Sequence, residues 1–263
     1  MKKIYLFQII LPLLVFLFNS CSTELELGGE GGSAKKNNST KLIKMVKWTE
    51  IYDGIEDVLE SFEYIYDDKQ RIKSIKGVNS FLLSSFTYEN NRITMRCDGF
   101  ESGYILDNTD YVTRVDIKNG DLEYYILCNY SNGNISKATV HNYPTNRSYT
   151  NNYTWENGNL TKISNGSGKT NSSYIYGNKE NRMNVDPFAY TTLFVFIDSY
   201  FMLTTGVFLP LKGTMSKNLP ESGIINGESV TISYKNESNG YPTEISINYT
   251  EDSYIQKIAI SYY

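Results

Sequence analysis

Short runs of alternating apolar and polar residues follow one another along most of the chain, separated by turns rich in Asn, Gly and Asp. The clearest unit is residues 153–163, in which a strand passes Trp155, enters an Asn157-Gly158 turn and leaves through Leu160. Asn-Gly is typical of a two-residue hairpin turn, because both residues tolerate the positive φ angles of a type I′ turn. This unit therefore predicts a β-hairpin.

The same hairpin unit recurs between residues 60 and 185. An aromatic residue precedes the turn of each clear unit, and these residues are Tyr66, Tyr88, Tyr130, Trp155 and Tyr176. They are 22, 42, 25 and 21 residues apart, and a weaker unit that contains Tyr104 fills the doubled interval. A period of about 22 residues suits one hairpin. Sequential hairpins without helical segments between them predict an antiparallel meander.

The side chains on the two faces of these strands indicate how the sheet is shaped. Phe62, Tyr64 and Tyr66 fall on one face, whereas Glu63 and Ile65 fall on the other, and polar residues mix with apolar ones on both. This mixture favours a semi-polar interior, and closure would remove exposed edges. We therefore predict an all-β fold, an antiparallel meander of repeated hairpins that forms a strongly curved or closed, barrel-like sheet.

The repeat is interrupted between residues 186 and 228. Asp186-Pro187 begins the interruption, and the following residues 188–211 are strongly apolar. Apolar residues at helical spacing predict a helix that begins after Pro187. Its length would suit a membrane span, but its Thr, Ser, Asp and Tyr content favours an insertion packed inside the sheet or capping it. Residues 212–227 are predicted to form a loop before the strands resume.

The first residues have the pattern of a secretory signal. Lys2 and Lys3 precede an apolar run that ends at Ser20-Cys21 and is shorter than the roughly 20 residues of a membrane span. A small residue directly before a cysteine at this place resembles a bacterial lipoprotein signal, which would make Cys21 the lipidated first residue of the mature chain. A plain signal peptide with a coincidental cysteine is the alternative.

The residues after Cys21 predict a flexible tether. Residues 21–41 are polar and glycine-rich, so they bury too little apolar surface to fold. Glu24 and Glu26 resemble the signal that sends Bacteroidota lipoproteins to the cell surface, with ordinary linker charge as the alternative. We therefore expect a signal peptide over 1–20, a lipidated tether over 21–41 and a single β-repeat domain over 42–263. The expected location is the outer membrane, facing the cell exterior, with its periplasmic face as the alternative.

The repeat, the interruption and the signal together resemble a known family. A unit ending in Asn-Gly-Asn-Leu-x-Lys-Ile is similar to the tyrosine-rich repeats of the Rhs/YD class. Combined with the late interruption and with Ser216-Lys217-Asn218-Leu219-Pro220, it resembles a Bacteroidota lipoprotein family of unknown function with a porin-like fold. The resemblance covers residues 42–263. It implies a barrel-like fold and carries over no catalytic residues.

Composition and motifs exclude several classes of function. Removal of Lys2 and Lys3 leaves 23 basic and 29 acidic residues, a net charge of −6, which argues against nucleic acid as a partner. His141 is the single histidine, so a histidine-based metal cluster is excluded, and no phosphate-binding or nucleophile motif occurs. Cys97 and Cys128 fall in different predicted strands, which leaves open a disulfide or two buried thiols. We expect no enzyme, no metal and no cofactor.

Two functions remain after these exclusions. The first is a binding or adhesion module for a glycan or a surface protein, held to the membrane through Cys21. In it, the five repeated aromatic residues would stack on the ligand. The second is a structural envelope lipoprotein that has no small-molecule ligand.

Overall fold

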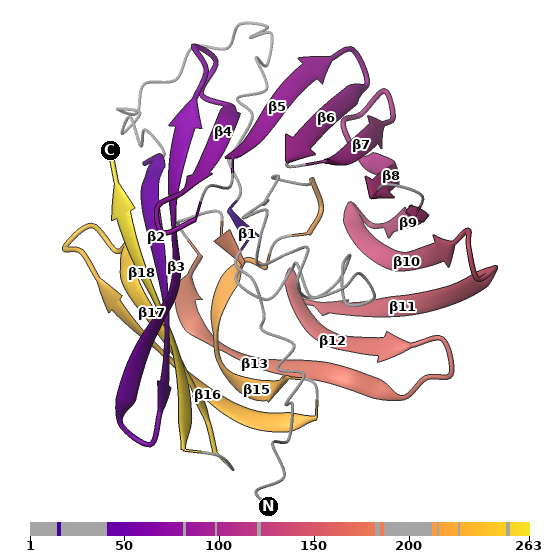
Figure 1. Cartoon of the computed structure of the whole chain (residues 1–263). Helices are drawn as coiled ribbons and strands as arrows, with labels where there is room; N and C mark the ends of the chain where they lie inside the picture. The colour runs from indigo at the N-terminus through magenta and orange to yellow at the C-terminus, as the bar shows by residue number, and fades with distance from the viewer. Residues whose placement is uncertain are drawn as a thin grey trace, which may run out of the picture.

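The structure is a computed structural model that describes residues 15–16, 41–80, 83–97, 99–119, 122–181, 185–186, 212–214, 216–225, 227–250 and 253–263. Within these residues the chain forms strands and turns, without a helix. Sixteen strands make one closed antiparallel barrel (Figure 1). The all-β meander predicted from the hairpin repeat is confirmed, and the sheet is closed rather than only curved.

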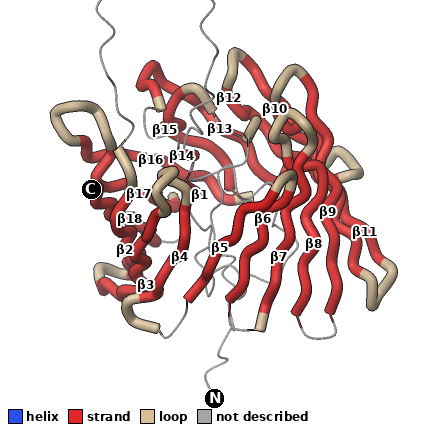
Figure 2. Tube along the Cα trace, turned by 90° about the horizontal axis from the view of Figure 1, so that it is seen from above, coloured by secondary structure: helices blue, strands red, loops and turns tan. Residues whose placement is uncertain are grey.

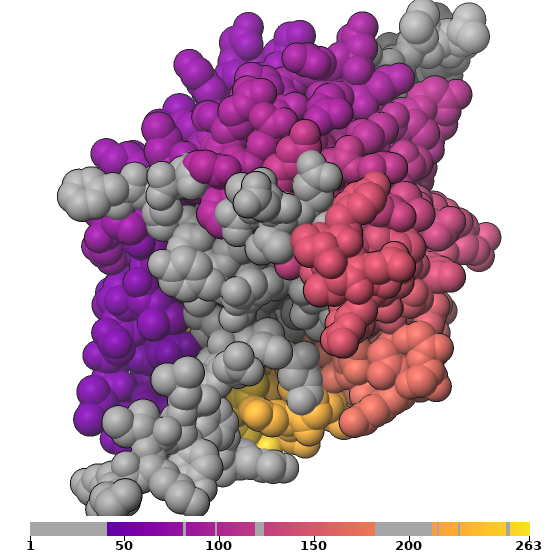
Figure 3. Space-filling model, turned by 45° about the vertical axis from the view of Figure 1, so that its right-hand side comes forward, coloured from indigo at the N-terminus to yellow at the C-terminus, as the bar shows by residue number. Residues whose placement is uncertain are grey.

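The strands follow one another around the barrel in chain order (Figures 2 and 3). They are β2 (Ile43–Tyr52), β3 (Ile55–Tyr66), β4 (Ile72–Gly77), β5 (Leu83–Glu89), β6 (Arg92–Cys97), β7 (Phe100–Leu106), β8 (Val112–Asn119), β9 (Leu122–Ser131), β10 (Asn134–Asn142), β11 (Arg147–Glu156), β12 (Asn159–Asn165), β13 (Thr170–Glu180), β15 (Asn218–Ile225), β16 (Glu228–Asn236), β17 (Pro242–Tyr249) and β18 (Tyr254–Tyr262). Two further strands, β1 (Val15–Phe16) and β14 (Val185–Asp186), pair with each other in a separate sheet.

The predicted Asn-Gly turns have the backbone geometry that the sequence requires. Asn157 and Gly158 have φ angles of 53° and 79°, and Asn132 and Gly133 have φ angles of 51° and 78°. Two successive positive φ angles are those of a type I′ turn, whose twist matches the flanking strands. The repeated turn thus fixes the hairpin geometry locally.

The barrel closes where the first and last of its strands meet. β18 pairs antiparallel with β2, from Tyr254 opposite Tyr52 to Tyr262 opposite Ile43. The last residue, Tyr263, adds a main-chain hydrogen bond of 3.0 Å to the Leu42 carbonyl. Closure therefore depends on residues more than 200 positions apart in sequence, which the hairpin pattern alone does not specify.

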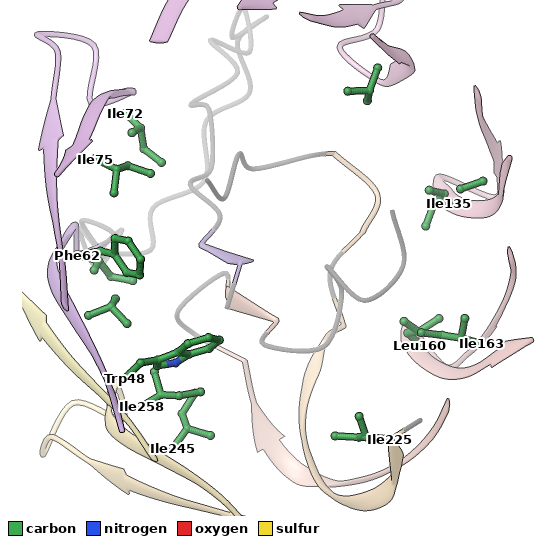
Figure 4. Packing of buried hydrophobic residues seen from close by; sticks show 14 of the residues in the cluster. Trp48, Phe62, Ile72, Ile75, Ile135, Leu160, Ile163, Ile225, Ile245 and Ile258 are labelled. Atoms are coloured by element: carbon green, nitrogen blue, oxygen red, sulfur yellow. The ribbon is translucent and has the colours of Figure 1, made fainter. Parts of the chain in front are cut away.

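Side chains alternate between the inside and the outside of the barrel wall. On β16, Val230 and Ile232 are buried, whereas Thr231, Ser233 and Lys235 are exposed. The buried set from all sixteen strands is dominated by Ile, Val, Leu and aromatic side chains, and Figure 4 shows several of them projecting from the wall into the ring. Polar side chains are buried as well, among them Thr94, Asn151 and Gln256. The buried set is therefore mainly apolar but includes polar groups, as the sequence led us to expect.

The interruption is narrower than predicted at its C-terminal end. Residues 212–227 were expected to form a loop, but Asn218–Ile225 is strand β15, which pairs with β13 and β16. Pro220 lies where the register with β13 shifts, a position that tolerates the missing N–H of proline. The helix expected after Pro187 falls on residues that lie outside the described part of the chain. Within the described residues, no helix is long and apolar enough to cross a membrane.

Candidate functional site

The five aromatic residues singled out by the repeat lie at one rim of the barrel. Each is near the end of an odd-numbered strand, and because neighbouring strands are antiparallel, these ends point the same way. All five rings are partly buried and pack against the apolar interior. The repeat thus marks a ring of inward-leaning aromatic side chains rather than an exposed stripe along the outer wall.

Each of these side chains donates a hydrogen bond to a main-chain carbonyl at the start of the preceding strand. The bonds run from Tyr66 to Ile43 (2.7 Å), Tyr88 to Ile72 (2.8 Å), Tyr130 to Val112 (3.0 Å), Trp155 to Ile135 (2.7 Å) and Tyr176 to Leu160 (2.7 Å). We call this repeated contact the rim ladder. It satisfies carbonyls near strand ends, where regular ladder bonding ends.

Two more tyrosines join the rim ladder that sequence reasoning did not select. Tyr234 donates to the Pro220 carbonyl and Tyr262 to the Pro242 carbonyl, each at 2.7 Å. Tyr234 has the expected turn signal, since Asn236 follows two residues later. Tyr262 has no Asn-Gly or Asp turn signal after it in the sequence.

One position of the rim ladder has no hydrogen-bonding side chain. Leu106 lies opposite Val112, as Tyr66 lies opposite Ile72, and it packs against the core. A leucine keeps the apolar contact but has no donor. This explains why the unit near Tyr104 looked weak in the sequence.

Burial keeps the rim tyrosines protonated. Desolvation raises the pKa of the Tyr66, Tyr88 and Tyr130 hydroxyls well above the ordinary value of 10.0. Protonated hydroxyls remain hydrogen-bond donors across the physiological range. In this geometry they link the end of each strand to the start of the preceding strand at the rim.

A pocket of about 510 Å³ opens at this rim between two neighbouring hairpins. Its lining includes Tyr66 and Tyr88 of the rim ladder, together with charged residues of the β3–β4 turn and of β4, namely Asp67, Asp68, Arg71 and Lys73. It combines aromatic surface with both signs of charge. In the sequence, Asp67-Asp68 is a turn signal and only a weak candidate for a catalytic carboxylate pair. The pocket is not visible there, because the neighbouring hairpin that completes it is specified by register and not by local pattern.

Arg71 organises the rim pocket. Its Nη2 lies 2.7 Å from Asp67 Oδ2, and its guanidinium carbon lies 4.2 Å from the centre of the Tyr88 ring. Asp67 Oδ1 accepts the main-chain N–H groups of Lys69 and Arg71, both at 2.9 Å. Partial desolvation opposes ionisation of Asp67, but the hydrogen bonds from Arg71 and Lys69 outweigh it and lower the pKa of the carboxyl. The arginine is thus held over Tyr88 as a fixed cation.

Two exposed charged side chains beside Arg71 add further polar groups to the rim pocket. Asp68 and Lys73 are both exposed at its edge. Aromatic surface with a few fixed polar groups is the usual composition of a small-ligand site, in which the polar groups set orientation. The arrangement suits the binding of a small polar molecule or of one sugar unit of a larger one.

The remaining sequence candidates lie away from the rim pocket. His141 stacks on Tyr125 with ring centres 4.4 Å apart, and its Nδ1 lies 2.8 Å from Ser148 Oγ. Cys97 and Cys128 are buried and are not bridged to each other, and burial raises the pKa of the Cys128 thiol to about 12. Across the described ranges, no group of three or more His, Cys, Asp and Glu side chains is placed to hold a metal. Cys21 lies outside them.

The fold defines a closed antiparallel barrel of the porin-like class. A porin-like protein from Bacteroides uniformis ATCC 8492 has a TM-score of 0.64 to this chain and 11% sequence identity, covering 86% of this chain and 99% of the other. A porin-like protein from Bacteroides vulgatus ATCC 8482 has a TM-score of 0.54 and 15% identity, covering 84% and 99%. These likenesses show the fold alone. No protein-family model matches the sequence, and no match was found among curated proteins.

Proposed function

We propose that this protein is a non-catalytic, lipid-anchored binding module of the bacterial cell envelope whose barrel stands outside the bilayer. The observation that carries this proposal is the polarity of the barrel wall. A transmembrane barrel has an apolar band outside and a polar lumen. Here the buried side chains are mainly apolar and the exposed ones mainly polar, with single exposed apolar residues such as Ile65, Leu127 and Ile175 between them.

The outer wall carries charges at the height where a spanning barrel would meet lipid. Lys47, in the middle of β2, and Lys137, in β10, are both exposed. A lysine on the lipid face near the midplane costs about 2–4 kcal/mol, so a wall with several such residues opposes insertion. A porin-like fold and a water-facing wall are compatible if another part of the chain holds the protein to the membrane.

Cys21 is the residue to which we assign that attachment. A lipidated Cys21 and the tether over 21–41 would hold the barrel near the outer membrane, facing the cell exterior, and leave both rims accessible. Lipid attachment at a single residue requires no apolar band on the barrel wall. This assignment rests on the signal pattern in the sequence.

The rim pocket is the place where we expect a glycan or a surface protein to bind. Tyr66 and Tyr88 supply aromatic surface, and Arg71, Asp68 and Lys73 supply fixed and adaptable polar contacts. A structural envelope lipoprotein remains the second candidate. The observation in its favour is that the ladder hydroxyls are engaged by main-chain carbonyls and do not point at a ligand.

A glycan-array measurement tests the rim pocket directly. The mature Cys21→Ser protein is labelled and compared with its Lys73→Ala and Lys76→Ala variants, two exposed lysines of the same strand of which only Lys73 lines the pocket. We expect Lys73→Ala to weaken binding about tenfold, equivalent to about 1.4 kcal/mol, and Lys76→Ala to leave it unchanged. If the array retains no glycan and the labelled protein captures no envelope protein, the structural role is favoured. An equal loss of binding by Lys73→Ala and Lys76→Ala would likewise count against the rim pocket and favour the structural role.

A further inference from the structure

The β2–β3 hairpin extends past the end of β4 and leaves one edge of β3 without a neighbouring strand. The last pair between β3 and β4 is Phe62 opposite Gly77, followed by a hydrogen bond of 2.8 Å from the Val78 N–H to the Ser61 carbonyl. On its other edge, β3 stays paired with β2 as far as Ile55. Residues 55–59 therefore have β2 on one side and, in the described part of the chain, no strand on the other (Figure 1). Glu60 is buried and accepts a hydrogen bond of 3.0 Å from the Asn79 N–H.

This edge stands out in a barrel that otherwise removes its edges by closure. A strand edge presents main-chain N–H and C=O groups that can pair with another chain, and proteins usually protect it with charged side chains, most often Lys, or with Pro, a β-bulge or a very short strand. This hairpin has a register shift at Trp48–Thr49, and the charges on its edge are acidic. Between Lys47 and Lys69 the sequence has neither a basic residue nor a proline. Five residues in extended conformation are enough to accept an added strand.

The tip of this hairpin, beside the open edge of β3, is also apolar. Ile55 is 75% exposed, Tyr52 is 50% exposed and Val58 is 38% exposed. The turn between the strands is Asp53-Gly54, with φ angles of 49° and 80°, so the tip is a tight type I′ hairpin rather than a loose loop. An added strand would find a preformed, partly apolar surface here.

The same hairpin carries acidic charge that nothing described nearby neutralises. Glu56 and Asp57 are exposed, and Asp57 lies directly opposite Glu50 in the β2–β3 pairing. Like charges at opposite positions destabilise a strand pair. Burial raises the pKa of Glu50, a hydrogen bond from Tyr254 lowers it, and the negative charge of Asp57 adds to the rise. A cation placed at this edge would relieve that repulsion.

We propose that the outer edge of β3, residues 55–59, binds an extended segment of a partner protein by strand addition, and that this segment alternates Lys or Arg with apolar residues. Its main chain would pair with the unpaired edge. Its cations would lie on the face that carries Asp57 and the opposite Glu50, and its apolar residues on the other face, against Val58. The inference deepens the binding role proposed above by naming a partner class, and it is independent of the rim pocket, which lies at the other end of β3.

A second copy of this chain is a poorer occupant of the same edge. Pairing two copies edge to edge would place Glu56 and Asp57 of one copy close to the same acidic residues of the other. That arrangement doubles the negative charge without supplying a cation, which opposes association. The chemistry of the edge thus favours a basic segment from another protein.

Peptide binding to the full mature protein tests the proposal. The probe is an acetylated and amidated Lys-Val-Lys-Val-Lys-Val-Lys peptide, titrated by fluorescence polarisation. One control peptide has Glu in place of Lys, and another is N-methylated on alternate residues, which removes strand hydrogen bonds and keeps the charge. The protein variants are Asp57→Lys, which puts a cation opposite Glu50, and the matched Glu156→Lys, an exposed acidic residue at the end of β11 that lies outside the rim pocket.

We expect Asp57→Lys and N-methylation each to weaken binding at least about tenfold, because both charge and main-chain pairing contribute. Glu156→Lys should bind as the parent does, and the Glu peptide should not bind. Equal binding by the N-methylated peptide, or unchanged binding by Asp57→Lys, would overturn strand addition at this edge.

Two other results would assign the edge to a different occupant. If light scattering shows that the parent is a dimer and that Asp57→Lys is a monomer, the edge belongs to a second copy. Peptide binding that appears only after Lys35 and Lys36 are replaced by Ala would assign it to the chain's own tether.

The glycan measurement keeps the two proposals separable. Loss of peptide binding with glycan binding intact contradicts only the assignment of the β3 edge. Glycan binding that is absent while the peptide binds contradicts only the assignment of the rim pocket.

Discussion

The hydroxyl of Tyr130, at the end of β9, donates a 3.0 Å hydrogen bond to the carbonyl of Val112, at the start of β8. The two residues are 18 positions apart in sequence and lie on adjacent strands. The same relationship recurs around the rim, from Tyr66 and Ile43 at one side of the closing seam to Tyr262 and Pro242 at the other. The sequence repeat therefore encodes a ring of tertiary hydrogen bonds as well as a series of hairpins.

Removing one hydroxyl from the rim ladder should destabilise the barrel. Tyr130→Phe keeps the ring but leaves the Val112 carbonyl without this donor, and an unsatisfied buried group costs about 1–3 kcal/mol. We expect the free energy of unfolding, measured by urea denaturation, to decrease by about 1–3 kcal/mol. Tyr52→Phe is the control, since Tyr52 is 50% exposed and outside the ladder. An equal effect of both substitutions would show that the ladder contributes nothing specific.

Filling the position that lacks a donor should have the opposite effect. Leu106→Tyr places a hydroxyl where the register predicts the Arg92 carbonyl as acceptor, because Ile105 lies opposite Arg92. A new hydrogen bond contributes about 0.5–1.5 kcal/mol net. We expect a higher urea midpoint for Leu106→Tyr than for the parent. Leu106→Phe, which adds the same ring without the hydroxyl, should have a lower midpoint than Leu106→Tyr. A Leu106→Tyr protein no more stable than Leu106→Phe would contradict this.

The Asp67–Arg71 pair should make a pH-dependent contribution to stability. The folded protein lowers the pKa of Asp67, so its stabilising effect is present above the unfolded pKa, near 3.8, and is lost as the pH falls through the folded value. We expect the difference in unfolding free energy between the parent and Asp67→Asn to be constant from pH 7 to about 5 and to shrink toward pH 3. The effect is small, because the pair is partly exposed and solvent screens it. A difference that grows on acidification would give the wrong sign.

The two buried cysteines should be chemically silent in the folded protein. Burial raises the pKa of Cys128 to about 12, so almost no thiolate exists at pH 7.5, and Cys97 is 2% exposed. We expect no maleimide labelling of either residue in native protein, and labelling of both in 6 M guanidinium, as read by mass spectrometry. Labelling of Cys128 without denaturant would show that the interior opens readily.

Local sequence pattern predicted the elements well and their closure less well. Strand β3 begins at Ile55 and ends at Tyr66, and the Asn157-Gly158 turn has the expected backbone, because alternation and turn chemistry are local properties. The pairing of β18 with β2, from Tyr254 opposite Tyr52 to Tyr262 opposite Ile43, closes the barrel, and no local sequence signal marks it. Strand β15 was taken for a loop because its Pro220 and Gly223 are uncommon inside strands, and register shifts accommodate them only in the folded sheet.

The candidate sites show the same division. Tyr66 and Tyr88 were selected from the repeat, but their partner Arg71 was not, since the two hairpins meet only through pairing of β4 with β5. The acidic edge of β3 also escaped sequence reasoning. The residues were visible as Glu56 and Asp57, but that β4 ends before reaching them is a property of the whole sheet.

The central claim is that the outer wall of the barrel faces water, and cysteine accessibility in native membranes tests it most directly. Ser233→Cys puts a thiol on the outer face of β16, and Ala138→Cys, at 2% exposure, puts one on the inner face of β10. Opened membrane fragments carrying each full-length variant are treated with a membrane-impermeant maleimide, with and without detergent, against the parent as background. The account predicts that Ser233→Cys reacts equally in both conditions and that Ala138→Cys does not react. A Ser233→Cys thiol that reacts only after detergent removes the lipid would contradict it and make the barrel a membrane span.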